Sequence, residues 1–317
     1  MPADAATPDD LGRLKPTRYR GRADLGLFLA FASRSTAARA PLGAQWHPGD
    51  MAWQMRSRYE CSQALYGFEA RDGFGAVAWF QAPGEMLLEV MPSAEELTEP
   101  LLAWALDKAR AAPAPMQASE LRITVFDSDL ARQERLANAG FRRAGPAGVH
   151  FERSLGEAPP APEPPPGIQI RDCVGVDAHA RSAAHRDAWS ALEHLGIDGR
   201  SDFSAAEYLS LLTSGAYDPV LDMVAEAEDG RLVANAIAWL DPASGVGIFE
   251  PVGVNPHHRG QGLAGAAMLE GMHRLRAAGA RLARVGTAHF NASAIAAYQR
   301  NFELVDRSST WSHPIED

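Results

Sequence analysis

The amino-acid sequence predicts two mixed α/β lobes arranged in tandem. Its 317 residues suit two domains better than one. A proline-rich stretch at 156–167, GEAPPAPEPPPG, divides them into halves of similar length. Stacked prolines lack backbone donors and favour extended geometry, so we interpret this stretch as a stiff linker. We therefore expect a flexible arm at 1–16, a first lobe at 17–155 and a second lobe at 168–317.

Strands are expected to alternate with helices in both halves, in the same order. VMP at 90–92 matches VNP at 254–256, an offset of 164 residues, and GFR at 140–142 matches NFE at 301–303, an offset of 161 residues. Between these anchors the halves share an expected strand (84–91 or 246–254), helix (94–111 or 260–277), second strand (120–127 or 282–288), short helix (129–139 or 291–300) and terminal strand pair. Gene duplication followed by divergence explains this pattern most simply.

Two expected hairpins precede the repeated elements. Residues 64–69 and 74–80 flank Asp72-Gly73, and residues 221–228 and 231–240 flank Asp229-Gly230. Asp-Gly is a preferred hairpin turn because its two positions tolerate positive φ. Elsewhere, LRITVF has the β-branched and aromatic residues of a strand, and the expected helix at 260–277 carries apolar residues at helical spacing.

The composition argues against several classes of protein. Hydrophobic residues make up 46% and charged residues 22%, which is ordinary globular usage and excludes wholesale disorder. A formal net charge of −10 disfavours nucleic acid and favours a cationic small molecule. The two cysteines, Cys61 and Cys173, are too few for a disulfide scaffold. We expect no signal peptide and no membrane partner, hence a soluble cytoplasmic protein, because the early apolar run at 25–32 is too short to span a bilayer.

One stretch, IFEPVGVNPHHRGQGLAG at 248–265, carries most of the chemical information. A strand is expected to end at Val254, and Arg259 to Ala264 then turn the chain into a helix. Backbone N–H groups at such a helix start are unpaired and lie at the positive end of the helix dipole. The glycines permit close approach, and Arg259 adds a fixed positive charge. The stretch therefore predicts a pyrophosphate-binding turn.

The glycines Gly260, Gly262 and Gly265 also spell GxGxxG, so a dinucleotide site has to be weighed. In that motif the first glycine directly follows the strand, whereas five residues, NPHHR, intervene here. The next expected strand, LARVGTA at 282–288, carries no acid to hold a ribose. A dinucleotide site is therefore disfavoured, and the sequence contains no GxxxxGK[ST] motif.

The stretch resembles the coenzyme A motif of GCN5-related N-acetyltransferases, in which a strand and V-x-P precede R-G-x-G-x-A. The downstream N-x-x-A-x-x-x-Y, formed by Asn291, Ala294 and Tyr298, is similar to the second motif of that family. Asn301-Phe302 stands where the family usually has Gly-Phe. The resemblance implies two tandem lobes, each a mostly antiparallel mixed sheet flanked by helices, and acetyl-CoA as cosubstrate.

The resemblance also implies roles for individual residues. The backbone of Val252, Gly253 and Val254 would pair with the pantetheine arm. Asn291 would contact pantetheine or hold the cleft open, and Tyr298 would lie near the thioester sulfur. The pyrophosphate would be held by the N–H groups of Arg259, Gly260, Gln261, Gly262, Leu263 and Ala264.

Direct transfer, which the resemblance implies, needs a base to deprotonate the acceptor ammonium and an acid or other group to stabilise the departing thiolate. Glu250 is the first candidate base, because strand alternation places it on the same face as Val254. His289, at the end of the following strand, is the second candidate base, and Tyr298 is the candidate acid. No histidine pair has zinc-ligand spacing with a third ligand, so we expect no metal.

The first lobe is predicted to be degenerate. At the repeat offsets, Arg259 corresponds to Glu95, Gly260 to Glu96, Gly262 to Thr98, Ala264 to Pro100, Glu250 to Met86, Asn291 to Leu130 and Tyr298 to Ala137. Carboxylates in place of the glycine turn oppose pyrophosphate binding. The lobe would then be structural or would shape the acceptor pocket, to which residues 47–53 are candidate contributors. Trp189, His194, Asp198, Tyr208 and Tyr217 are candidate lining residues in the second lobe.

The expected function is acetyl transfer from acetyl-CoA to a primary amine, most simply that of a small molecule, by a monomer or homodimer. Three alternatives stay open: a non-catalytic acyl-CoA-binding or regulatory module, a protein N-acetyltransferase, and an acetyltransferase similar to mycothiol synthase, which also has two such lobes.

Overall fold

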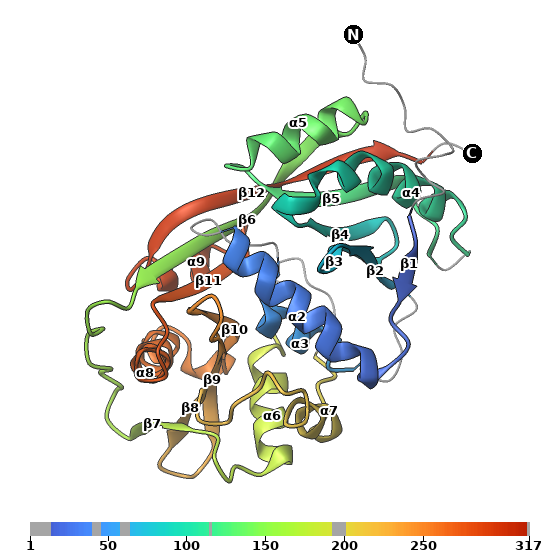
Figure 1. The fold of residues 1–317 in the computed structure, drawn as a ribbon. Helices are drawn as coiled ribbons and strands as arrows, with labels where there is room; N and C mark the ends of the chain where they lie inside the picture. Colours follow the sequence, from blue (N-terminus) through green and yellow to red (C-terminus); the bar gives the residue numbers. More distant parts are fainter. Residues whose placement is uncertain (1–13, 40–45, 58–63, 114–115, 192–200, 316–317) are drawn as a thin grey trace. The chain divides into compact units, whose positions relative to one another are not determined.

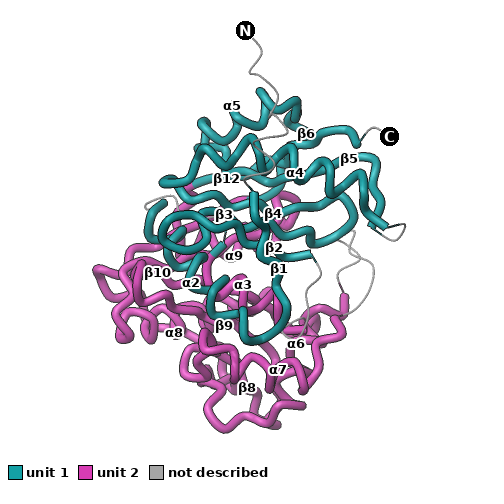
Figure 2. Tube along the Cα trace, turned by 45° about the vertical axis from the view of Figure 1, so that its right-hand side comes forward, with its two compact units in different colours: residues 1–46, 58–148, 306–317 teal, residues 47–57, 149–305 magenta. Residues whose placement is uncertain are grey.

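The structure, a computed structural model, describes residues 14–39, 46–57, 64–113, 116–191 and 201–315. It divides into two compact units, drawn in different colours in Figure 2. Unit 1 comprises residues 1–46, 58–148 and 306–317, and unit 2 comprises residues 47–57 and 149–305. The units are therefore not contiguous halves: a short N-terminal segment belongs to unit 2, and the C-terminal segment belongs to unit 1.

Unit 1 is a mixed sheet with helices (Figure 1). Its strand order is β1-β2-β3-β4-β5-β12, and among the pairs assigned, only β4 and β5 are parallel. The strands are β1 (Pro16–Arg18), β2 (Leu65–Ala70), β3 (Gly73–Ala82), β4 (Glu85–Val90), β5 (Glu120–Phe126) and β12 (Glu303–Pro314). The helices are α2 (Arg22–Ala38), the 3-10 helix Pro92–Leu97, α4 (Thr98–Arg110) and α5 (Leu130–Asn138).

Unit 2 has the corresponding strand order β6-β11-β10-β9-β8-β7, with β10 and β11 parallel. The strands are β6 (Arg142–Ser154), β7 (Ile168–Asp172), β8 (Asp222–Ala227), β9 (Leu232–Asp241), β10 (Val246–Val254) and β11 (Leu282–Ala288). The helices are α3 (Pro48–Met55), α6 (Ala178–Ala188), α7 (Ala205–Leu211), the 3-10 helix Pro256–His258, α8 (Leu263–Ala277) and α9 (Ala292–Tyr298). The predicted class, mixed α/β with a mostly antiparallel mixed sheet, is confirmed.

Both predicted hairpins are present, and in each half the two strands expected on either side of the long helix pair in parallel, β4 with β5 and β10 with β11. The predicted terminal strand pair of each half is wrong, because a single long strand follows α5 and another follows α9. Each of these strands is divided between the units: β6 from residue 149 onward belongs to unit 2, and β12 from residue 306 onward belongs to unit 1.

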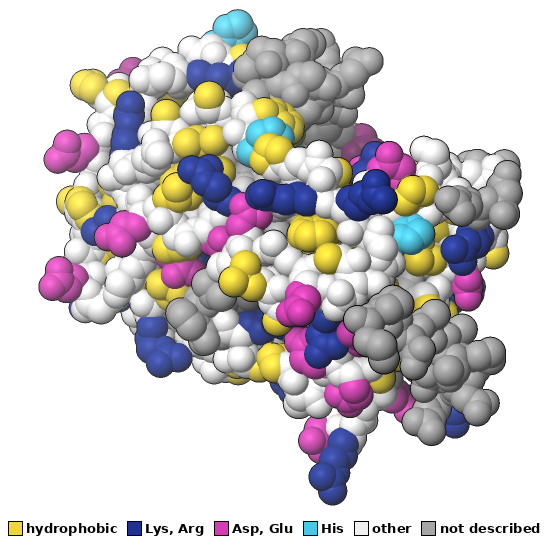
Figure 3. Space-filling view, turned by 90° about the horizontal axis from the view of Figure 1, so that it is seen from above, with side chains coloured by type: hydrophobic (Ala, Val, Ile, Leu, Met, Phe, Trp, Pro, Cys, Tyr) yellow, Lys and Arg dark blue, Asp and Glu magenta, His cyan; other side chains and the backbone are white. Residues whose placement is uncertain are grey.

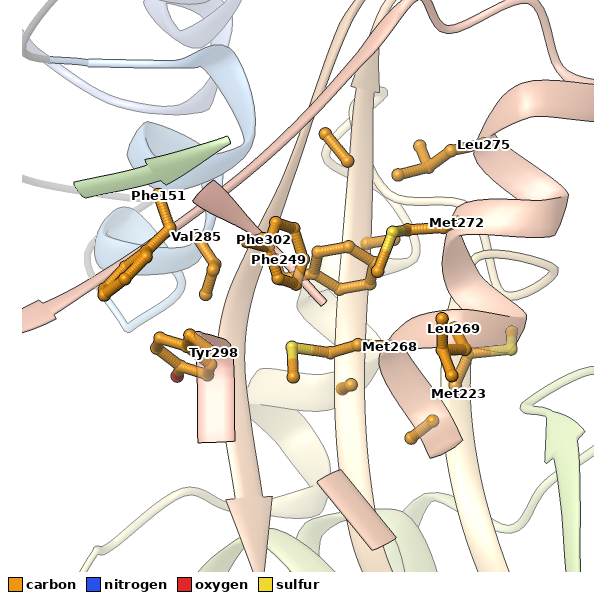
Figure 4. Close-up of a cluster of buried hydrophobic side chains, with 14 of the residues drawn as sticks. Phe151, Met223, Phe249, Met268, Leu269, Met272, Leu275, Val285, Tyr298 and Phe302 are labelled. Carbon is orange, nitrogen blue, oxygen red and sulfur yellow. The ribbon is translucent and has the colours of Figure 1, made fainter. Parts of the chain in front are cut away.

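The two faces of the unit 2 sheet carry different helices. Phe249 packs with Met268 and Met272 of α8 in a buried cluster of this unit (Figure 4). Ala238 of β9 belongs to the same cluster, whereas the next residue, Trp239, lies against α3, since a Cβ at Gly49 would be 2.3 Å from it. Because successive strand residues point to opposite faces, α8 and α3 cover opposite faces of the sheet.

A buried ion pair fixes α6 to the sheet on the same face as α3. Arg181 donates two hydrogen bonds to Asp222 of β8, at 2.8 and 3.0 Å, and both side chains are fully buried. Tyr217 donates to the same carboxylate at 2.8 Å, and its hydroxyl lies 3.0 Å from that of Tyr208. The network holds the helix whose C-terminal end supplies one wall of the candidate site.

We expect Asp222→Asn to lower the free energy of unfolding by roughly 3–5 kcal/mol, because the substitution leaves the Arg181 charge buried without its counter-ion. Urea denaturation measures the loss. The matched control is Asp229→Asn, which breaks the exposed pair with Arg231 at the β8–β9 turn and is expected to leave stability unchanged within error. Equal behaviour of the two variants would contradict the assignment of Arg181 and Asp222 as a stability-determining pair.

Acidic and basic side chains are interspersed with apolar ones on the face drawn in Figure 3. Among the residues that the structure describes, none of the helices combines the length and apolar character needed to cross a membrane.

Candidate functional site

The candidate site lies where two neighbouring strands of unit 2 diverge. The parallel ladder between β10 and β11 ends at Phe249 and Val285, whereas β10 stays paired with β9 as far as Val254. A register shift between Phe249 and Val252 marks an irregularity in β10 at this point. Beyond it, β10 has no register with β11, and an extended ligand could pair with this edge, where the carbonyl of Val254 accepts a long hydrogen bond, 3.4 Å, from Arg259.

A pocket of about 390 Å³ opens along this edge. It is bounded by the end of α6, the last residues of β10, the turn into α8 and one side of α9. Its lining residues are Ala188, Trp189, Val252, Gly253, Val254, His258, Arg259, Gly260, Gly262, Leu263, Ala264, Gly265, Asn291, Ser293, Ala294, Ala296, Ala297, Tyr298 and Arg300.

The turn into α8 has the geometry of an anion-binding helix start. Gly262 is the N-cap of α8 with φ +80°, and Gly260 has φ +78°, both in the region that L side chains rarely adopt. The N–H of Ala266 is bonded to the carbonyl of Gly262, so the preceding N–H groups of the first turn are left for another partner. A Cβ at Gly260 or Gly262 would meet no atom within 4 Å, so the space above the turn is open. This arrangement fits a pyrophosphate.

Arg259 is held beside this turn by the end of α6. Its guanidinium donates to the carbonyls of Ala188 and Ala191, both at 3.1 Å. The predicted positive charge is therefore present at the pocket wall, but the side chain also ties the glycine turn to α6. His258 and Arg300 line the same pocket and add polar groups able to bind phosphate oxygens.

Trp189 packs directly on the diverging strand. A Cβ at Gly253 would lie 2.1 Å from the Trp189 ring and 2.8 Å from the Cβ of Ala188, so only glycine allows this approach. The indole also stacks on the ring of His185, with 4.1 Å between centroids. Trp189 therefore forms a flat wall over Gly253, on the face of β10 that α6 covers.

Asn291 lines the pocket but has structural partners of its own. Its side-chain oxygen caps α9 by accepting from the N–H of Ala294 at 3.2 Å, and its amide donates to the hydroxyl of Thr287 at 3.1 Å. The residue therefore fixes the start of α9, the helix that carries Tyr298 into the pocket.

Tyr298 lies close enough to Glu250 for the carboxylate to affect the pKa of its hydroxyl. Tyr298 is 6% exposed and packs against Phe151 and Phe302 at the edge of the cluster in Figure 4. Burial raises the pKa of its hydroxyl, and the nearby Glu250 raises it further, so the hydroxyl is protonated at neutral pH. Burial also raises the pKa of Glu250 to about 8; the charge of Asp50 adds to the increase and that of Arg56 opposes it.

Other predicted residues lie elsewhere. His289 is exposed at the end of β11, beside Phe290, and is not part of the pocket lining. Gln261 is exposed on the turn and is also absent from the lining. Tyr208 and Tyr217 belong to the buried network around Asp222. His194 and Asp198, like Cys61 and residues 1–13 of the expected arm, lie outside the described residues.

Sequence reasoning missed Arg300, Ser293 and Ala297. Ser293 and Ala297 lie one turn apart on α9, and Arg300 follows the end of that helix. Sequence reasoning also left undecided whether α3 contributes to the acceptor pocket. Asp50 and Arg56 influence Glu250, and no sequence pattern connects residues 50 and 250.

The corresponding position in unit 1 is filled by its own side chains. The β4–β5 register ends at Met86 and Ile123, so these strands also diverge. Arg132 then donates to the carbonyl of Leu88 at 3.1 Å, and Arg39 donates to that of Val90. At the repeat offset, these carbonyls correspond to those of residues 252 and 254 in unit 2.

Carboxylates hold these two arginines in place. Glu89 is fully buried, accepts from Arg39 at 2.6 Å and from Ser35 at 2.9 Å, and lies 3.7 Å from Arg132. Glu95, at the position of Arg259, lies 3.3 Å from Arg39. Two arginines therefore bind the carbonyls of Leu88 and Val90 on β4, whereas residues 252–254 of β10 line a pocket and the carbonyl of Val254 accepts a longer hydrogen bond, 3.4 Å, from Arg259. Within the described part of the chain, no group of three or more potential ligands is arranged to hold a metal ion.

Comparison with known proteins agrees with this geometry. Residues 189–303, which include all but one of the pocket residues, match the acetyltransferase (GNAT) family. No curated protein sequence matches the chain. Among solved structures, the chain is similar to a GCN5-related N-acetyltransferase from Sphaerobacter thermophilus, with 22% identity, 98% of each chain covered and a TM-score of 0.60.

Two further structures resemble it over nearly their whole length. One is a tandem GNAT protein from the clavulanic acid biosynthesis pathway, with 18% identity, 96% of this chain and 98% of that chain covered, and a TM-score of 0.60. The other is a GNAT-family acetyltransferase from Colwellia psychrerythraea, with 14% identity, 94% of this chain and 99% of that chain covered, and a TM-score of 0.55. Residues 189–303 therefore form a domain of the GNAT acetyltransferase family, within a chain that has the fold of a tandem GNAT protein.

Proposed function

We propose that the protein transfers an acetyl group from acetyl-CoA to the primary amine of a small molecule, using one site per chain in unit 2. Acyl transfer from acetyl-CoA is the general activity of the GNAT family. The observation that carries the proposal is the pocket that runs from the glycine turn at Gly260 and Gly262, along the end of β10 that has diverged from β11, to Tyr298. A phosphate-binding turn, an extended edge and a proton donor follow one another in the order that acetyl-CoA requires.

The residues divide the binding task between them. The N–H groups from Gly260 to Ala264 would hold the pyrophosphate, with Arg259 and Arg300 supplying positive charge. The backbone of residues 252–254 would pair with the two amides of the pantetheine arm. Trp189 would cover the arm from the α6 side, which excludes water from this part of the pocket.

Two side chains would move the protons of the reaction. Acetyl-CoA supplies the activated acetyl group and a thiolate leaving group. The carboxylate of Glu250 takes a proton from the acceptor ammonium, so that the neutral nitrogen can form the new bond to the acetyl carbon. The hydroxyl of Tyr298, protonated at neutral pH, gives its proton to the departing sulfur. Holding both reactants in one pocket supplies much of the remaining rate enhancement.

The test is a transfer assay that follows the release of free coenzyme A thiol. Spermidine and n-butylamine represent alkylamines, glucosamine represents amino sugars, and a short peptide with a free N-terminus represents a protein acceptor. We expect thiol release to depend on a small amine. Transfer to the peptide alone would favour a protein N-acetyltransferase, and tight acetyl-CoA binding without transfer to any amine would favour a non-catalytic binding module.

A paired substitution tests the glycine turn. Gly262→Val forces a β-branched residue into positive φ and points its side chain into the open space above the turn, so acetyl-CoA binding should be lost. Gly279→Val introduces the same kind of strain, at φ +94°, beyond the other end of α8 and should leave binding unchanged. Calorimetric titration with acetyl-CoA measures both. Equal effects would mean that Gly262 matters only for folding.

A further inference from the structure

Helix α3 comes from the N-terminal half of the chain but is built into unit 2. Its N-cap His47 accepts from the N–H of Gly49 at one ring nitrogen, and the other ring nitrogen lies 3.1 Å from the carbonyl of Val246 on β10. Gly49 packs directly against the side chain of Trp239 on β9, because a Cβ at this position would lie only 2.3 Å from it. The start of α3 is therefore fixed on β9 and β10.

The same tryptophan connects α3 to the candidate base. The indole N–H of Trp239 donates to the backbone carbonyl of Glu250 at 2.5 Å, at the irregular position of β10. Gly49 lies against one part of this side chain, and Glu250 accepts from another. Asp50, which follows Gly49, is thereby brought to the part of the sheet where Glu250 lies.

Aromatic contacts continue from α3 to the pocket. Trp53, one turn after Asp50, lies 5.2 Å from the ring of His185 and 5.0 Å from that of Phe203. His185 stacks on Trp189, which lines the pocket. The guanidinium of Arg56 lies over Trp53, 4.1 Å from its ring centroid, and 4.0 Å from the carboxylate of Glu207. Asp50 on α3 and Arg56 at its C-cap are therefore held by a helix that contacts β9, β10 and the aromatic residues beside the pocket.

We propose that Asp50 on α3 and Glu250 on β10 act as one carboxyl pair at the acceptor end of the site, with Asp50 making Glu250 a stronger base for the acceptor's proton. The proposal rests on the proposed acetyl transfer. Asp50 is a positioning residue in this scheme: the proton passes from the acceptor nitrogen to Glu250, and Asp50 acts through its charge. Arg56, on the same helix, limits the effect.

The charges around Glu250 support this assignment. Among the described residues, Asp50 and Arg56 reach it from α3, Tyr298 reaches it from α9, and Trp239 of β9 contributes a neutral N–H. Burial raises the pKa of Asp50 to about 7, with the N–H of His47 opposing the increase. The two carboxyl groups therefore titrate in the same neutral range, where a negative charge on one makes the other hold its proton more strongly.

Burial and, after it, the charge of Asp50 give Glu250 a pKa suited to a base. A carboxylate of ordinary pKa accepts a proton from an alkylammonium only with a large free-energy cost, because the two pKa values are about six units apart. Raising the pKa of Glu250 towards 8 removes about half of that gap while leaving the group partly ionised near neutral pH.

The test needs no acceptor amine. It compares two substitutions that change the charge near Glu250 in opposite directions. Asp and Glu carboxyl carbons are labelled with ¹³C and titrated by NMR, and the signal of Glu250 is assigned from its absence in Glu250→Gln. Asp50→Asn removes a negative charge and should lower the Glu250 midpoint by about 1 pH unit. Arg56→Gln removes a positive charge and should raise it. Asp229→Asn, on an exposed turn of the same unit, should leave it unchanged.

The outcomes for the carboxyl pair and for acetyl transfer can be distinguished. A Glu250 midpoint that is equal in wild type and Asp50→Asn would overturn the carboxyl pair, whether or not the protein acetylates amines. A shifted midpoint in a protein that acetylates none of the four acceptors would leave the pair in place and count against the transfer. If the protein transfers acetyl groups, the acidic limb of the pH profile of kcat/KM should follow the NMR midpoint. It should move to lower pH in Asp50→Asn and to higher pH in Arg56→Gln.

Discussion

Glu250→Gln is expected to lower kcat by about 10²–10⁴-fold at neutral pH, because the acceptor ammonium loses its base. In the wild type, the rate should rise as Glu250 ionises with a pKa of about 8. The amide cannot ionise, so that limb should disappear. The remaining rate should increase only at higher pH, where more of the acceptor amine is already neutral. A pH profile of kcat/KM measures the change.

Two controls accompany the Glu250 substitution. Calorimetry with acetyl-CoA should give an unchanged Kd, because Glu250 is not part of the pocket lining. Glu303→Gln, which neutralises an exposed carboxylate of the same unit, should leave the profile unaltered. If Glu250→Gln retained the wild-type profile, Glu250 would be excluded as the base.

Tyr298→Phe is the second substitution with a large expected effect. It removes the hydroxyl but keeps the ring, so the contacts with Phe151 and Phe302 and the fold of α9 should be preserved. We expect acetyl-CoA binding to be unchanged and kcat to fall by about 10²-fold or more, because the departing sulfur loses its proton donor. Stopped-flow or steady-state thiol release measures the rate, and calorimetry measures the binding.

The outcome for Tyr298 distinguishes catalysis from packing. A variant that binds acetyl-CoA normally but turns over slowly supports the acid role. Unchanged turnover would remove Tyr298 from the mechanism and leave it as a residue of the buried cluster. If the variant lost both acetyl-CoA binding and stability, the hydroxyl would be needed for the structure of α9.

Local patterns predicted much of the fold. Asp72-Gly73 and Asp229-Gly230 identified two hairpins, because their turn chemistry is contained in a few residues. The motif around Gly260 and Gly262 identified the start of α8, although the regular helix begins at Leu263. The helix of the first half likewise starts late, at Thr98, since each proline after the strand begins a 3-10 turn instead.

Features that depend on distant contacts could not be predicted in the same way. The hydrogen bond from His47 to Val246 joins residues 199 positions apart, and no periodicity links α3 to β10. The filled edge of β4 depends on Arg39 and Arg132, which come from two different helices of unit 1. His289 was predicted from its place at a strand end, but strand alternation and the following turn decide where its side chain points, and it is exposed.

The most direct test of the account is the stoichiometry of acetyl-CoA binding to the full chain, measured by calorimetry for the wild type and for Arg259→Glu. The account predicts one site per chain, because a pocket lies along residues 252–254 of β10, whereas the corresponding carbonyls of β4, those of Leu88 and Val90, accept from Arg132 and Arg39. It also predicts that Arg259→Glu abolishes binding, by reversing the charge at the pyrophosphate turn. Two sites per chain, or one site that survives Arg259→Glu, would contradict it.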